Sequence, residues 1–294
     1  MLLVLAAIWG ASYLFIKVAL DDIEPAPMMA IRALGAGLVL TVYLALTIGG
    51  RRAFGEVRRS WRPAFVLGAL NASIPYWLVA WGEKHIDTSV AGIAQSTVPI
   101  FTFLLAMRFL PHEHVGATRV AGVVVGFLGV AMLAGLDPRG GWLAVAGTLA
   151  VVLSSLSYAS AGVYGQLRVR TVAGPVLATG SMLAGGLILL PLALFQLPTH
   201  APDAEAIAAL LALTLVGTAF AQLVLFRMLR LFGSRRLSLV TYLIPGFAVV
   251  YGAAFLDEPV SLAALGGLAL ILAGVALASG ERMLRASRAQ QEPA

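Results

Sequence analysis

The sequence contains no cysteine, and only 12% of its 294 residues are charged, against about a quarter in soluble domains. The absence of cysteine excludes a disulfide framework, cysteine-based zinc sites and thiol catalysis. The scarcity of charge, together with 60% apolar residues, excludes an ordinary water-soluble domain. The net charge of +6 does not indicate a nucleic-acid binder, because the basic residues lie in short stretches between apolar runs, as in membrane proteins.

Groups that could carry out catalysis are also scarce. No aspartate or glutamate falls in the central part of a long apolar run, so no buried carboxylate for proton relay is expected. A membrane-embedded enzyme would need paired acids, a serine with a base or a histidine-rich metal set. The four histidines lie between runs, and the cluster His112-Glu113-His114 has no second set of ligands. The sequence therefore predicts no enzymatic activity, no cofactor and no metal site.

Ten apolar runs are long enough to cross about 30 Å of hydrocarbon as helices. They cover residues 2–20, 27–48, 63–82, 89–108, 116–136, 142–164, 175–197, 206–226, 237–256 and 261–279. The sequence therefore predicts an all-α integral membrane protein with ten transmembrane helices.

The connectors between the runs alternate in charge. Those after the second, sixth and eighth runs are basic, whereas those after the first, third, seventh and ninth runs are acidic. The first basic connector carries Arg51, Arg52, Arg58, Arg59 and Arg62, and the first acidic one carries Asp21, Asp22 and Glu24. Lysine and arginine accumulate on the cytoplasmic side of a membrane. Both termini are therefore expected in the cytoplasm.

A pattern of proline, glutamate and glycine occurs twice, half a chain apart. Pro99 and Pro245 are each followed by Phe-Leu, then by Glu113 or Glu258, and then by glycines at matching offsets. Each copy belongs to a unit of five runs, and matching connectors have opposite charge, so the second unit is expected to be inverted in the membrane. Inverted repeats are typical of secondary transporters. The expected units are residues 1–138 and 139–280, followed by a cytoplasmic tail at 281–294.

The two prolines also indicate where a substrate would bind. Each falls near the middle of its run and frees the carbonyl four residues earlier, that of Gln95 or Thr241. Interrupted helices at matching midplane positions mark transporter sites, and polar or aromatic stripes on other runs favour a shared cavity. The alternatives are kinks that only shape packing and hydrogen bonds that only join helices. The residues expected to bind substrate are Trp9, Tyr13, Lys17, Tyr76, Trp77, Gln95, Tyr158, Gln222 and Tyr242, with Pro99 and Pro245 as bends.

Two basic residues, Lys17 and Arg32, lie plainly inside apolar runs. Either their side chains reach the outer surface near Asp21 or Asp22 or pair with other groups of the protein, or they attract a carboxylate or phosphate of the substrate. Glu113 and Glu258 are expected to have a structural role near the start of the helix that follows each of them, as a cap or as a favourable partner of the helix dipole. Close helix approach is expected at glycines 122, 126, 129, 267 and 274.

These features resemble the EamA-like family of the drug/metabolite transporter superfamily. The resemblance rests on Trp9-Gly10, on Lys17 seven residues later, on Arg32 in the second run and on the duplicated proline–glutamate–glycine pattern. It implies two inverted five-helix units around a central cavity. It also implies a bacterial inner-membrane carrier, in a family with many exporters of amino acids or other small metabolites.

The expected function is secondary transport by alternating access, with export of amino acids or similar small metabolites across the inner membrane. Uptake of small organic solutes by the same architecture is the alternative, because direction is not encoded in these patterns. A membrane-embedded enzyme is the candidate from another class. The expected partners are a small-molecule substrate and the lipid bilayer, with no nucleic acid, and association into a homo-oligomer is left open.

Overall fold

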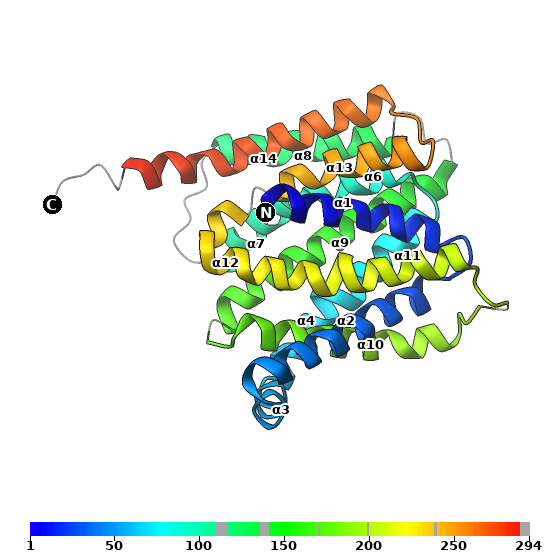
Figure 1. The fold of residues 1–294 in the computed structure, drawn as a ribbon. Helices are drawn as coiled ribbons and strands as arrows, with labels where there is room; N and C mark the ends of the chain where they lie inside the picture. Colours follow the sequence, from blue (N-terminus) through cyan, green and yellow to red (C-terminus); the bar gives the residue numbers. More distant parts are fainter. Residues whose placement is uncertain (110–116, 136–140, 170, 199, 238–239, 289–294) are drawn as a thin grey trace.

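The computed structural model describes residues 1–109, 117–135, 141–169, 171–198, 200–237 and 240–288, and these residues form a helical bundle without strands (Figure 1). The first half contains α1 (Leu2–Ala19), α2 (Pro25–Ile48), α3 (Gly50–Arg59), α4 (Trp61–Gly68), α5 (Ile74–Glu83), α6 (Thr88–Ala94), α7 (Val98–Phe109) and α8 (Ala117–Gly135). The second half contains α9 (Gly141–Arg168), α10 (Gly174–Leu194), α11 (Ala204–Thr214), α12 (Ala221–Leu237), α13 (Val240–Phe255) and α14 (Leu262–Arg288).

Three short segments of altered helical pitch join consecutive helices. The π-helical segment η1 (Ala69–Ser73) joins α4 to α5, and a second one, η3 (Leu215–Phe220), joins α11 to α12. The 3-10 turn η2 (Gln95–Thr97) joins α6 to α7. Each of these three composite helices therefore runs on without a loop.

Seven helices of the described part are long and apolar enough to cross a membrane. They are α1, α2, α9, α10 and the composite helices Trp61–Glu83, Thr88–Phe109 and Ala204–Leu231. Shorter apolar helices lie at Val120–Leu133, Val240–Phe255 and Leu262–Leu277, where the remaining predicted runs fall. Large apolar side chains such as Leu46 (82% exposed) and Leu187 (58% exposed) cover the outside, which suits lipid rather than water. The prediction of an all-α, multi-pass membrane protein is confirmed.

Local sequence explains where several helices begin. Pro25 and Pro175 each occupy one of the first two positions of a helix, where a missing backbone N–H costs nothing. Asp203 precedes α11, and its carboxylate accepts a hydrogen bond from the Ala206 nitrogen at 2.8 Å. Helix α3 is the basic connector predicted after the second run, and it projects away from the bundle in Figure 1.

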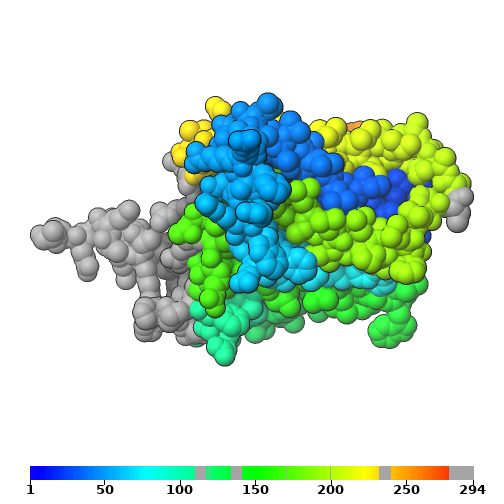
Figure 2. Space-filling model, turned by 90° about the horizontal axis from the view of Figure 1, so that it is seen from below, coloured from blue at the N-terminus to red at the C-terminus, as the bar shows by residue number. Residues whose placement is uncertain are grey.

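The helices pack in pairs that join the two halves of the chain. Helix α14 lies along α8, α10 lies along α2, and α13 lies along α6. Helix α1 contacts α13 and α11, while α9 contacts α7 and α5. Figure 2 shows α2 to α4, in blue to light blue, crossing the face on which α10 lies in yellow-green. The core between these helices is therefore shared by both halves.

The pair formed by α8 and α14 is held at backbone contact by glycines. A Cβ atom added at Gly274 would lie 2.5 Å from the Gly126 nitrogen and from the Gly122 carbonyl oxygen. One added at Gly129 would lie 2.8 Å from the Gly267 carbonyl oxygen. The predicted close approach at these glycines is confirmed.

Replacing Gly274 by alanine should destabilise the protein by about 1–3 kcal/mol, because the new methyl group meets backbone atoms that cannot rotate away. The midpoint of thermal unfolding in detergent measures the effect. Gly162→Ala is the matched control, since a Cβ atom there meets nothing within 4 Å and alanine favours the helix. An unfolding midpoint for Gly274→Ala that equals that of the wild type would contradict the close packing.

Candidate functional site

A cavity of about 350 Å³ lies between the two halves of the chain, and its volume suits a small metabolite. Its wall is built from α1, α2, η1, α5, α6, the turn η2 and α7 of the first half. From the second half come α9, η3, α12 and α13. The cavity is therefore lined by helices that are far apart in the sequence.

Most of the residues predicted to bind substrate face this cavity. Those that line it are Trp9, Tyr13, Tyr76, Gln95, Tyr158, Gln222 and the bend residue Pro245. Lys17, Trp77, Tyr242 and Pro99 are not among its lining residues. Trp77 instead packs against Trp81, with ring centroids 6.4 Å apart, and Tyr242 packs against the hydrophobic core.

Arg32 is the charged residue that lines the cavity. Its Nε donates a hydrogen bond to Thr218 Oγ1 at 2.9 Å, and its guanidinium carbon lies 4.0 Å from the centre of the Tyr76 ring. The residue is 7% exposed, so the interpretation in which it reaches the outer surface near Asp21 or Asp22 is wrong. Within the described residues its further hydrogen bond goes to the Met29 sulfur, so most of its five N–H donors remain available to a ligand.

Gln95 is held in place by two serines of α9. Its Oε1 accepts a hydrogen bond from Ser154 Oγ at 2.9 Å, and its Nε2 donates one to Ser155 Oγ at 3.0 Å. The Gln95 carbonyl, which Pro99 deprives of its helical partner, accepts a hydrogen bond from the same Ser155 hydroxyl at 3.4 Å. The side chain is thereby fixed at the cavity wall by interactions between the two halves.

Sequence reasoning missed the two π-helical segments, which carry further cavity residues. Asn71 lies in η1, while Gly217 and Thr218 lie in η3. Pro75 was the available signal for η1, because in a regular helix its ring would clash with the carbonyl of Asn71. In η3 the Thr218 hydroxyl donates a hydrogen bond to the Leu213 carbonyl, five residues earlier, at 2.9 Å. Such segments often occur at functional sites.

Glu258 caps α6, one of the helices that line the cavity. Its carboxylate accepts hydrogen bonds from the backbone nitrogens of Thr88 (2.6 Å) and Ser89 (3.0 Å), at the start of α6. The role of Glu258 is structural, as predicted, but the helix that it caps is α6 and not the following helix α14, which Ser261 caps by accepting from the Ala264 nitrogen. Glu258 links the halves instead, and the equivalent Glu113 and its neighbouring histidines lie outside the described residues.

The turn before Glu258 has unusual geometry. Asp257 has a φ of 51°, in the left-handed region that aspartate tolerates better than most residues. The Glu258 nitrogen donates a hydrogen bond back to the Gly252 carbonyl at 3.1 Å. This turn brings the Glu258 carboxylate against α6.

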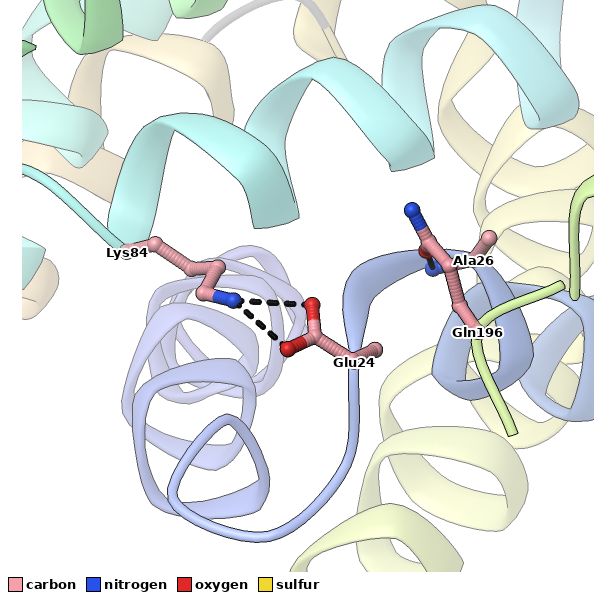
Figure 3. Close-up of polar contacts among 4 residues, drawn as sticks. All are labelled: Glu24, Ala26, Lys84 and Gln196. Atoms are coloured by element: carbon pink, nitrogen blue, oxygen red, sulfur yellow. Dashed lines mark hydrogen bonds and ion pairs between the residues drawn. The ribbon is translucent and has the colours of Figure 1, made fainter. Parts of the chain in front are cut away.

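Further polar contacts gather at the same, acidic end. Lys84 donates to both carboxylate oxygens of Glu24, at 2.8 and 2.9 Å, and the Ala26 nitrogen donates to Gln196 Oε1 at 3.2 Å (Figure 3). The Asp203 nitrogen donates to Asp22 Oδ2 at 2.7 Å. The two latter contacts and the Glu258 cap join the halves at this end.

Lys17 also lies at the acidic end. Its Nζ donates hydrogen bonds to the carbonyls of Glu83 (2.7 Å) and Ile86 (2.9 Å), where α5 ends. A cation at a helix C-terminus satisfies carbonyls that have no helical partner. Lys17 thus forms a structural contact between α1 and the end of α5, within the first half.

Comparisons with known proteins agree with a membrane carrier. The model of the EamA-like transporter family matches residues 1–135 and 145–280. An uncharacterized transporter of Archaeoglobus fulgidus is 25% identical, over 91% of this chain and 93% of its own. Protein PecM of Dickeya dadantii is 28% identical, over 91% and 87%. A crystal structure superposes with a TM-score of 0.66 over 96% of both chains, and its 21% identity supports the fold alone.

Proposed function

Because this chain belongs to the EamA-like transporter family, we propose that it exports amino acids or similar small metabolites from the cytoplasm by alternating access. Several of its relatives carry names of transporters, including the uncharacterized inner membrane transporter YedA of Escherichia coli. Membrane transport is the family's activity, and the chain is not an enzyme. The substrate class and the direction are the proposal.

The position of Arg32 carries the proposal for the substrate. A buried guanidinium with free N–H donors is suited to binding a carboxylate in a fixed, two-point geometry. Trp9, Tyr13 and Tyr158 supply apolar and aromatic surface to the same cavity. A molecule with a carboxylate at one end and a small amphipathic remainder matches this lining.

The arrangement of the helices supports two inverted five-helix units, residues 1–138 and 139–280, with ten transmembrane helices in total. Each spanning helix of the first unit has its counterpart five spanning helices later. Three of these counterparts are also in contact with each other: α2 with α10, α8 with α14, and α6 with α13. The counterpart of α1 is α9, and the counterpart of α13 is the helix that contains α7. The contact of α1 with α13 in one pair is matched by the contact of α9 with α7 in the other. The π-helical segments η1 and η3 also fall on matching helices. These correspondences are those expected of a duplicated transporter fold.

The polar contacts at the acidic end support alternating access. The connectors at this end carry Asp22, Asp203 and Glu258, so the positive-inside rule places it outside and both termini in the cytoplasm. In the described conformation the two halves are joined there by the Glu258 cap and its neighbouring contacts. Release of these contacts would open the cavity to the outside.

Transport assays with the purified protein in liposomes test this function. Vesicles loaded with one unlabelled amino acid at a time should exchange it for the same radiolabelled amino acid, above the level of protein-free vesicles. Cells that overproduce the chain should also release that amino acid faster than cells without it. The proposal is contradicted if no member of a panel of amino acids and related carboxylates exchanges, and faster uptake without faster release would contradict export.

A further inference from the structure

Glu83, the last residue of α5, is fully buried. Its exposed fraction is 0%, and neither carboxylate oxygen has a hydrogen-bond partner among the described residues. The sequence analysis placed Glu83 in the acidic connector after the third run, and it expected no buried carboxylate. The structure corrects this, because helix α5 continues to residue 83 and packs the side chain inside.

An ionised carboxylate in this environment would be costly. Removing such a charge from water costs several kcal/mol unless other groups hydrogen-bond to it, whereas a protonated carboxyl group is neutral and costs far less. The nearby Lys17 ammonium gives hydrogen bonds to two backbone carbonyls, including that of Glu83 itself, and none to the Glu83 carboxylate. The surroundings therefore favour a bound proton on Glu83.

The position of Glu83 connects the cavity to the outer contacts. Tyr76 and Val79 line the cavity, and Glu83 follows them on the same face of α5 at helical spacing. Glu83 thus lies one turn beyond the cavity, toward the end where Glu258 caps α6.

Charged and titratable groups on several elements lie close enough to this carboxyl group to act on it electrostatically. They are Lys17 and Tyr13 of α1, Arg32 of α2 and Glu258 of the connector before α14. A sodium ion would need several oxygen ligands at once, but the nearby carbonyls of Glu83 and Ile86 already accept hydrogen bonds from Lys17, whereas a proton needs only one carboxylate oxygen. The surrounding groups therefore favour a proton over sodium.

We propose that Glu83 is the proton-binding carboxyl group that couples transport to the pH gradient, an inference that rests on the proposed transport function. The proton enters from outer water when the Glu258 contacts open and forms an O–H bond on the Glu83 carboxylate. When the site closes on the outside and water reaches Glu83 through the cavity, that bond breaks and the proton leaves to the cytoplasm. Proton entry thereby drives substrate export.

The transport test compares Glu83→Gln with the wild type in liposomes that contain a pH-sensitive dye. A radiolabelled mixture of the standard amino acids is the transported probe. The wild type should accumulate the probe with an imposed pH gradient and move protons in the opposite direction. Glu83→Gln should lose both effects yet still exchange labelled for unlabelled probe, and the exposed control Glu205→Gln should behave as the wild type. Gradient-driven accumulation by Glu83→Gln, or drive by sodium without proton movement, would overturn the inference.

A spectroscopic test decides the protonation state without transport. The infrared spectrum of the wild type at neutral pH should contain a band from the protonated carboxyl group of Glu83. Exposed acids have pKa values near 4 and are ionised at this pH, so they do not contribute to the band. The band should vanish in Glu83→Gln and shift in Glu83→Asp, which serves if the glutamine variant does not fold. Absence of this band overturns the role of Glu83, whatever the transport result. Absence of any probe exchange by the wild type, with the band present, contradicts the transport function instead.

Discussion

Replacing Arg32 by glutamine should lower kcat/KM for a carboxylate substrate by about 100-fold. Hydrogen bonds to a charged group contribute about 1.5–3 kcal/mol each, and a loss of about 3 kcal/mol corresponds to roughly this factor. Glutamine keeps a hydrogen-bond donor but removes the charge and the two-point geometry. The measurement is the rate of exchange in liposomes over a range of substrate concentrations.

Matched variants separate the role of Arg32 in binding from a role in folding. Arg32→Lys keeps the charge without the planar fork, so its activity should fall between those of wild type and Arg32→Gln. Arg51→Gln removes an exposed arginine of α3 and should leave exchange unchanged. Substrates without a carboxylate should lose little from Arg32→Gln. Equal kcat/KM values for Arg32→Gln and wild type with a carboxylate substrate would rule out this binding mode.

Replacing Glu258 by alanine should open the acidic end of the protein. The change removes two charge-assisted hydrogen bonds to the start of α6, at 2.6 and 3.0 Å. A loss of about 3 kcal/mol shifts the balance between closed and open conformations by about 100-fold. The open conformation should become correspondingly more populated.

A cysteine reporter measures that shift, because the chain has no cysteine of its own. Val79→Cys places a thiol on the cavity wall, 6% exposed in the wild-type structure. A membrane-impermeant maleimide added to intact cells should label it about 100-fold faster with Glu258→Ala than without. Val260→Cys, exposed at the acidic end, should be labelled equally in both backgrounds. Unchanged labelling of Val79→Cys would mean that Glu258 does not hold this end closed.

The candidate site was largely predictable at the level of helix faces. Trp9 and Tyr13 face the cavity because both lie on the face that α1 turns inward, and Gln95 does so because Pro99 disturbs the helix beside it. Trp77 and Lys17 show the limit of this reasoning. Each follows a cavity residue closely along its helix, yet its side chain has other partners. Trp77 packs against Trp81, and Lys17 donates to two carbonyls at and just beyond the end of α5.

The sequence by itself determined the membrane class, the positions of the spanning helices and the family. The class and the helix positions depend on the length and apolar character of single segments, because each backbone polar group in hydrocarbon must be satisfied within its own helix. The family follows from the order of short motifs along the chain. Only the tertiary structure decided that Arg32 faces the cavity, that Glu258 caps α6 and that Glu83 is buried. Glu258 meets Thr88 across 170 positions of the chain. The partner of a charged side chain depends on which distant helix packs against it, and segment composition does not specify that pairing.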